Sequence, residues 1–123
     1  MLRTTTITVS LAAALALMTP SADAHPRLRT ASPASGAVLK VAPREIHMKF
    51  SEGLIVQFVR LQLKDGKGRS VPIGSATLNQ GDNTKLVVPI RARLAAGTYS
   101  VAWSAVSVDT HRISGSYSFK VAR

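Results

Sequence analysis

The amino-acid sequence predicts an all-β fold, a single antiparallel β-sandwich with Greek-key connections and about seven to nine short strands. Apolar and polar residues alternate with a period of two in several segments, as they do along half-buried strands. Clusters rich in Gly, Pro, Asn and Asp separate these segments. The 123-residue chain has no cysteine, so we expect neither a disulfide nor a thiolate metal site.

Residues 1–24 are predicted to be a cleaved secretory signal peptide. Arg3 supplies a positive charge, a mostly apolar run covers residues 7–18, and Ala22-Asp23-Ala24 has the Ala-x-Ala pattern of a cleavage site. The alternative is a transmembrane anchor, but spanning a bilayer takes about 20 apolar residues. We therefore expect one exported domain, residues 25–123, that begins at His25.

Five segments after residue 24 carry the strand pattern most clearly. They are residues 44–50, 59–64, 84–90, 99–105 and 117–121. In the first segment Ile46, Met48 and Phe50 share one face, which predicts that they lie in the core. Trp103 has the phase of Tyr99 in the fourth segment, so we expect it in the core rather than on a binding surface. Residues 106–115 are predicted to join the last two strands.

The charge balance limits the classes of partner. The chain has 16 Lys and Arg against 6 Asp and Glu, a formal net charge of +10, and removing Arg3 and Asp23 leaves it unchanged. This charge predicts attraction to anionic surfaces of the cell envelope, the alternative being a merely soluble cationic surface. We expect no nucleic-acid partner, because an exported domain seldom meets one and the chain lacks an aromatic stacking platform.

The predicted connector carries the candidate metal ligands Asp109 and His111. Two residues apart on an extended backbone, their side chains would point to the same face. Taken alone, the pair is a weak signal, and a solvated turn is the better interpretation. Its significance depends on His25, which cleavage after Ala24 would make the first residue.

A histidine at the chain terminus offers two donors to one metal ion, its α-amine and its ring Nδ1. Pro26 has no backbone N–H, so the metal cannot bind the second backbone nitrogen as it does in flexible peptides. Coordination is then completed by the fold, and His111 with Asp109 would complete a tetragonal set of three nitrogens and one oxygen. This geometry and ligand mix favour Cu(II).

Three further residues have side chains that could serve at a metal site. Glu52 follows a predicted strand, and it is either an exposed loop carboxylate or a partner that orients a ligand through a hydrogen bond. His47 points outward on the same face as Glu45, so we do not expect it to be a metal ligand. Met48 faces the predicted core, where packing is its expected role.

Several segments, taken in order, resemble the CopC family of periplasmic copper-resistance proteins. The similarity covers nearly all of residues 25–123 and includes every proposed ligand. The segments are His25-Pro26-Arg27-Leu28, Ser32-Pro33-Ala34-Ser35-Gly36, Phe50-Ser51-Glu52, Val56-Gln57-Phe58, the run at residues 96–103 and the run at residues 106–115.

The resemblance implies a Greek-key β-barrel or sandwich close to the immunoglobulin type, in the periplasm. It also implies one Cu(II) ion per mature chain, held by His25, Asp109 and His111, with Glu52 beside the copper as a weak ligand or an orienting group. Some family members hold Cu(I) in a Met-rich loop. The corresponding residues 64–72 of this chain contain neither Met nor His, so we expect no Cu(I) site.

We therefore expect a monomeric, non-enzymatic protein that buffers, sequesters or delivers copper, contributing to copper homeostasis or resistance. An inner-membrane copper transporter is a candidate recipient. Two alternatives come from other classes. A copper ion chelated by an N-terminal histidine also occurs in lytic polysaccharide monooxygenases, which are oxidative enzymes, and a metal-free module could bind an envelope partner through its sheet edges.

Overall fold

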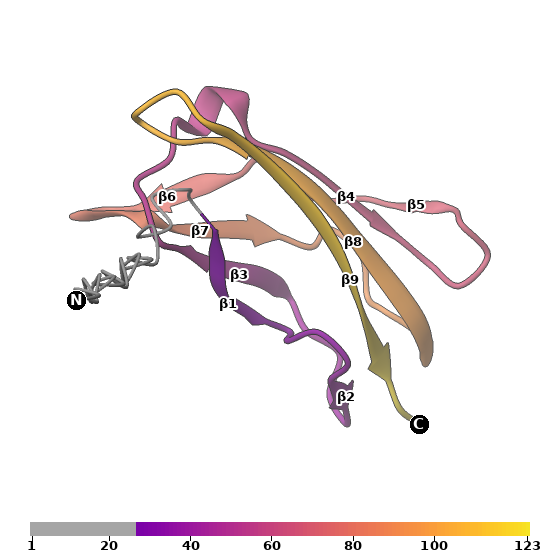
Figure 1. The fold of residues 1–123 in the computed structure, drawn as a ribbon. Coiled ribbons are helices and arrows are strands. Elements are labelled where there is room, and N and C mark those ends of the chain that lie inside the picture. The colour runs from indigo at the N-terminus through magenta and orange to yellow at the C-terminus, as the bar shows by residue number, and fades with distance from the viewer. Residues whose placement is uncertain (1–26) are drawn as a thin grey trace, which may run out of the picture.

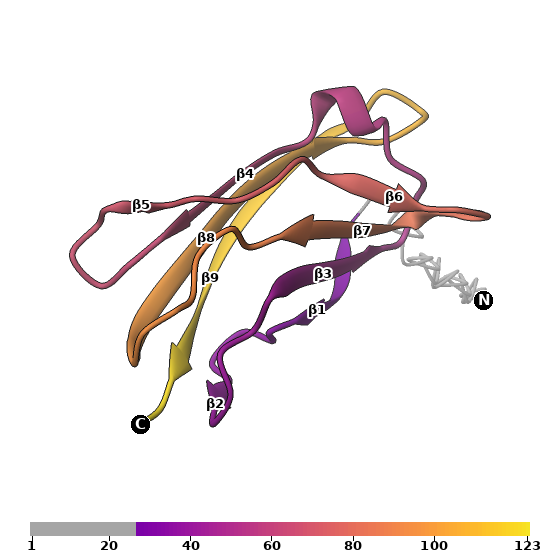
Figure 2. The ribbon, with the colours of Figure 1, turned by 180° about the vertical axis from the view of Figure 1, so that it is seen from behind.

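The computed structural model describes residues 27–123, which form two β-sheets that face each other (Figures 1 and 2). One sheet has the strand order β1 (Leu28–Ser32), β3 (Glu45–Phe50), β7 (Asp82–Pro89) and β6 (Thr77–Asn79). The other has the order β2 (Val38–Leu39), β9 (Arg112–Val121), β8 (Gly97–Val106), β4 (Arg60–Lys64) and β5 (Ser70–Val71). The predicted all-β sandwich is confirmed.

The only helical element of residues 27–123 is a short 3-10 turn, η1 (Val56–Phe58). In this part of the chain, no helix has the length and apolar character needed to cross a membrane. The predicted signal peptide and His25 lie outside the described residues.

The core follows from the alternation in the sequence. Ile46, Met48 and Phe50 of β3 are buried, and the alternating residues of β8 from Tyr99 to Ala105 are buried opposite them. Phe50 meets Trp103 edge to face, with ring centroids 5.3 Å apart, a favoured aromatic geometry. The predictions that Met48 and Trp103 belong to the core are confirmed.

Gly115 of β9 lies directly against Trp103. A Cβ atom added at Gly115 would come 2.7 Å from Cζ2 of the indole ring, closer than packed carbon atoms approach one another. The glycine therefore makes room for the largest side chain of the core.

The strand prediction was wrong in one pairing. β2 runs parallel to β9, with Val38 opposite Lys120 and Leu39 opposite Val121, whereas all other strand pairs are antiparallel. The chain leaves β1 in one sheet and joins the other sheet alongside β9, where the amide of Gly36 donates to the carbonyl of Ser118 at 2.7 Å. A strand this short carries no period that a sequence could show.

The connector between the last two strands is shorter than predicted. β8 and β9 pair continuously up to Val106 and Arg112, so the connection is the turn Ser107–His111 rather than residues 106–115. We call the end of the sandwich that holds this turn and η1 the upper end. The lower end holds β2, the start of β3, the β4–β5 turn and the C-terminus. In Figure 1, β2 and the C-terminus lie at the bottom and the β4–β5 turn projects to the right.

The β4–β5 turn at the lower end is organised by Asp65. Its carboxylate accepts hydrogen bonds from the backbone amides of Lys67 and Arg69 at 2.9 and 3.0 Å and from Nε of Arg69 at 3.1 Å. These contacts, led by the backbone amide of Arg69, hold the pKa of Asp65 below its usual value of 3.8. The ionised carboxylate therefore stabilises the hairpin.

We expect Asp65→Ala to lower the free energy of unfolding at neutral pH. Because the folded-state pKa lies below 3.8, this stabilisation is fully present above pH 3.8 and is lost as the pH falls through the folded-state value. Urea unfolding at pH 7 and at roughly pH 2.5 checks this. A difference between wild type and variant that stays constant or grows on acidification would contradict it.

Candidate metal centre

The turn Ser107–His111 brings Asp109 and His111 together. The backbone amide of Ser107 donates to the carbonyl of His111 at 2.9 Å, and the amide of Thr110 donates to the carbonyl of Ser107 at 2.8 Å. Thr110 has a φ of 71°, a left-handed conformation that a β-branched residue rarely adopts. The extended backbone expected for Asp109 and His111 is therefore wrong, and a tight turn makes their side chains adjacent instead.

Oδ2 of Asp109 lies 3.1 Å from Nδ1 of His111, and the two side chains are 48% and 53% exposed. Two donors at about 2.0 Å from one ion, at a right angle, are about 2.8 Å apart. The observed separation therefore fits neighbouring positions around a tetragonal ion. Both side chains are open enough to solvent for an ion to reach them.

Ser107, which the sequence reasoning missed, holds the pair in place. It is fully buried, its Oγ donates a hydrogen bond to Oδ1 of Asp109, and it accepts one from the backbone amide of His111 at 3.2 Å. The hydrogen bond from the Ser107 hydroxyl is the main cause that lowers the pKa of the Asp109 carboxyl, and the contact with His111 lowers it further. Asp109 is therefore kept ionised and oriented, as a metal-binding carboxylate must be.

A signal for Ser107 was present in the sequence. The buried positions of β8 fall on odd residue numbers from Tyr99 to Ala105, and the same phase continues to Ser107. A serine in a core phase needs a hydrogen-bond partner, and the nearest polar side chain along the chain is Asp109.

We expect Ser107→Ala to weaken Cu(II) binding roughly tenfold to a hundredfold, the range typical of losing a group that orients a ligand. Competition titration against a copper chelator measures the affinity. Ser114→Ala is the matched control, because Ser114 is an exposed serine of β9. Equal affinities of the two variants would show that Ser107 does not position the site.

The first described residue is tied to the loop that follows β3. The amide of Arg27 donates to Oγ of Ser51 at 2.9 Å, and the amide of Ser51 donates to the carbonyl of Arg27 at 2.9 Å.

The same loop contacts the turn that carries Asp109 and His111. The amide of Val108 donates to the carbonyl of Gly53 at 2.8 Å, and Leu54 forms an isolated antiparallel bridge with Ser107. Glu52 is half-buried and sits between Ser51, which holds Arg27, and Gly53. The structure thus places Glu52 in the segment that links the start of the domain to the turn.

Gly53 is required for this link. A Cβ atom there would come 2.4 Å from Nδ2 of Asn83, and the carbonyl of Asn83 accepts the amide of Leu54 at 3.0 Å. These contacts between β7 and the loop were not visible in the sequence, since they depend on which strands become neighbours.

The other histidine of the described chain has a different setting. His47 points outward from β3, and its Nε2 lies 2.8 Å from Oε2 of Glu45, as its phase predicted. Within residues 27–123 no group of three or more His, Cys, Asp or Glu side chains is placed to hold a metal ion. The described residues bring together only Asp109 and His111 of the predicted ligand set.

Comparison with known proteins gives concordant matches. The family model of the CopC domain matches residues 28–122. Copper resistance protein C of Pseudomonas syringae pv. tomato is 39% identical over 126 residues, covering 98% of this chain and 99% of that protein.

Two crystal structures share the fold. CopC from Methylosinus trichosporium OB3b has a TM-score of 0.74 and 26% identity, over 80% of this chain and 94% of that one. PcoC, a methionine-rich copper resistance protein from Escherichia coli, has a TM-score of 0.69 and 37% identity, over 80% of this chain and 99% of that one.

Proposed function

Because this chain belongs to the CopC family, we propose that it is a periplasmic Cu(II)-binding protein that buffers, sequesters or delivers copper. The observation that carries the proposal is the pair Asp109 and His111, 3.1 Å apart at the upper end. The copper-resistance names of its relatives support the choice of metal. Copper is the cargo of the protein in this proposal.

The full ligand set requires cleavage after Ala24. The processed terminus would supply the α-amine and Nδ1 of His25, and the turn would supply His111 and Asp109. The anchoring of Arg27 by Ser51 supports this arrangement, because it holds the start of the domain on the loop that also contacts Val108. An uncleaved chain has an amide at His25 in place of the amine and lacks one donor.

Glu52 is proposed to orient a ligand. Its segment lies between the anchor of Arg27 and the contact with Val108, which supports a role beside the proposed copper site. A carboxylate there can accept a hydrogen bond from the amine or from an imidazole N–H.

We propose one Cu(II) site and no Cu(I) site. Residues 64–72, which include the β4–β5 turn and β5, contain no thioether or imidazole, and Met48 is buried in the core. Soft thioether ligands are what Cu(I) selects. The proposed role is therefore to hold copper in one oxidation state.

The experiment is a titration of the processed protein, residues 25–123, with Cu(II). One tight equivalent is expected, released by chelator and by acid as protons compete for the nitrogen donors. Binding of several weak equivalents with no tight one would refute the proposal.

We propose binding rather than oxidative catalysis. Trp103 and Tyr99 are buried in the core, so they cannot form a flat surface on which sugar rings stack. Asp109 would also occupy a coordination position that oxygen chemistry needs open. Copper-loaded protein incubated with ascorbate and polysaccharide should yield no oxidised sugars, and their formation would favour the enzyme instead.

A further inference from the structure

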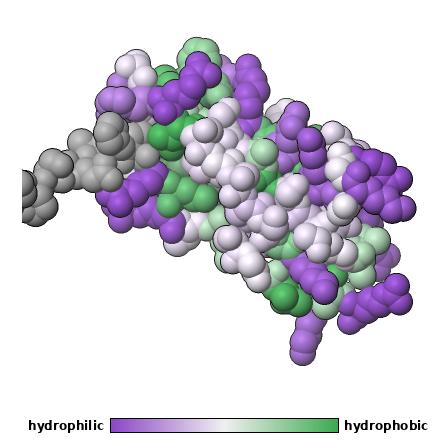
Figure 3. All heavy atoms as spheres, turned by 45° about the vertical axis from the view of Figure 1, so that its right-hand side comes forward, coloured by the Kyte–Doolittle hydropathy of each residue, from purple (hydrophilic) through white to green (hydrophobic). Residues whose placement is uncertain are grey.

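Basic residues concentrate at the lower end of the sandwich, away from the candidate metal centre. The start of β3, the β7–β8 connection, β2, the end of β9 and the β4–β5 turn all meet there. Their cationic residues are Lys40, Arg44, Lys64, Lys67, Arg69, Arg91, Arg93, Lys120 and Arg123. In Figure 3 hydrophilic side chains project at the right and lower right of the molecule, and others lie at its upper left.

Few acidic residues offset these charges. Of the acids in residues 27–123, Glu52, Asp82 and Asp109 belong to the upper end, where β7 begins and the β8–β9 turn lies. At the lower end Asp65 pairs with Arg69 at 3.1 Å, and Glu45 contacts His47 at 2.8 Å. No ion pair between Arg44 or Arg93 and a carboxylate is formed within residues 27–123.

Apolar side chains are exposed among these cations. Val38 of β2 is 64% exposed, and Val41, which follows Lys40 in the segment that joins β2 to β3, is 80% exposed. Exposed apolar residues that gather on one surface mark candidate contact sites. Apolar side chains surrounded by Lys and Arg are typical of protein surfaces that rest on anionic membranes.

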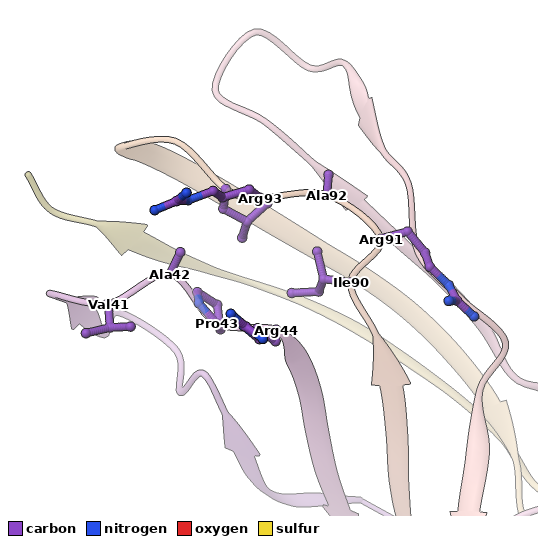
Figure 4. A pocket seen from close by; sticks show the side chains of 9 residues that line it. Val41, Ala42, Pro43, Arg44, Ile90, Arg91, Ala92 and Arg93 are labelled. Atoms are coloured by element: carbon purple, nitrogen blue, oxygen red, sulfur yellow. The ribbon is translucent and has the colours of Figure 1, made fainter.

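A hollow of about 530 Å³ opens between these elements, lined by residues that include Val41, Arg44, Ile90, Arg93 and Leu94 (Figure 4). Arg44 comes from the start of β3 and Arg93 from the β7–β8 connection. Arg91 also lines the hollow, but its side chain points away from Arg44 and Arg93 in Figure 4. Arg44 and Arg93 thus bring positive charge to the surface around the exposed Val41.

We propose that the lower end of the sandwich binds the surface of an anionic phospholipid bilayer. Arg44 and Arg93 contact lipid phosphates, and Val38 and Val41 enter the interface between headgroups and acyl chains. A soluble anion would satisfy the arginines but leave both valines in water, so the apolar residues select the bilayer. The candidate metal centre, at the other end, then faces the aqueous compartment. This inference does not rest on copper binding.

The charge test uses the processed protein and sedimenting vesicles. Vesicles with about 30% phosphatidylglycerol should bind the protein, while pure phosphatidylcholine vesicles should not, and about 0.5 M NaCl should abolish binding by screening. The double variant Arg44→Glu/Arg93→Glu should lower partitioning roughly tenfold or more.

The matched control is Arg29→Glu/Lys85→Glu, which changes the net charge equally on exposed positions of β1 and β7. It should keep most of the binding. Equal losses in both double variants would mean that net charge alone acts, and equal binding to both vesicle types would also overturn the proposal. Both double variants should retain one Cu(II), so a failure here is distinguishable from a failure of copper binding.

A second measurement reads the orientation directly. Val41→Trp and Val108→Trp place a reporter at opposite ends, on positions that are 80% and 54% exposed, while Trp103 stays buried in both. On anionic vesicles the emission of Val41→Trp should shift to shorter wavelength and that of Val108→Trp should not. A shift in Val108→Trp alone would place the membrane contact at the upper end and overturn the proposal.

Discussion

A processed chain whose α-amine is acetylated is expected to bind Cu(II) roughly a hundredfold or more weakly than the processed chain with a free amine. Acetylation converts the α-amine of His25 into an amide and supplies no new amine, so it removes one donor and its chelate ring. Pro26 prevents the next backbone nitrogen from replacing it, since proline has no N–H. Competition titration of the two proteins, both purified without metal, measures the difference.

The control for this comparison is the fold. The thermal midpoints of the metal-free proteins should agree, because the first strand pair begins at Leu28 opposite Phe50. Copper should raise the midpoint of the processed chain much more, since a ligand that binds only the folded state stabilises it. Equal copper affinities would show that the terminal amine is not a ligand.

His111→Ala should lower Cu(II) affinity by a similar factor of roughly a hundredfold or more. The side chain is half-exposed, and its Nδ1 lies 3.1 Å from Oδ2 of Asp109. Its loss removes an imidazole donor, while the backbone hydrogen bonds that form the turn remain. Because the side chain packs little against the core, the free energy of unfolding without metal should change by less than about 1 kcal/mol.

His47→Ala is the matched control, because His47 is also a half-exposed histidine beside a carboxylate, 2.8 Å from Glu45. It lies on the outer face of β3 and should leave the affinity for the first equivalent of Cu(II) unchanged. The reverse result, with His47 required and His111 dispensable, would move the site to β3.

The fold was predictable where strands are long and one face is buried. β3 and β8 show strict alternation, and their buried faces were predicted residue by residue. Three short strands were not predicted: β2, β5 and β6. Two or three residues are too few to show an alternation of apolar and polar side chains. β1 was missed for another reason, since its pairing with β3 is irregular between Leu28 and Thr30.

The candidate site was predictable in its residues but not in its construction. The spacing of Asp109 and His111 suggested an extended backbone, yet the left-handed conformation of Thr110 and the buried hydroxyl of Ser107 create the contact. Gly53 is needed because the side chain of Asn83 packs directly against its Cα, and this contact joins segments that are distant in the sequence. Such contacts follow from strand pairing, which local patterns do not specify.

The two ends of the sandwich differ in chemistry. The upper end combines His111 with Asp109 and Glu52, and the lower end combines arginines with exposed valines. If both proposals hold, the protein would collect copper at the end that faces away from the membrane surface it rests on. Copper binding and membrane binding would then be separable by mutation.

The most direct test of the central claim is the EPR spectrum of the processed protein, residues 25–123, loaded with one equivalent of Cu(II), after mass spectrometry has confirmed that the chain starts at His25. We predict a tetragonal signal with three nitrogen donors and one oxygen donor. They are the amine and Nδ1 of His25, one ring nitrogen of His111 and a carboxylate oxygen of Asp109. A spectrum that is identical for the chain acetylated at His25 would contradict the account.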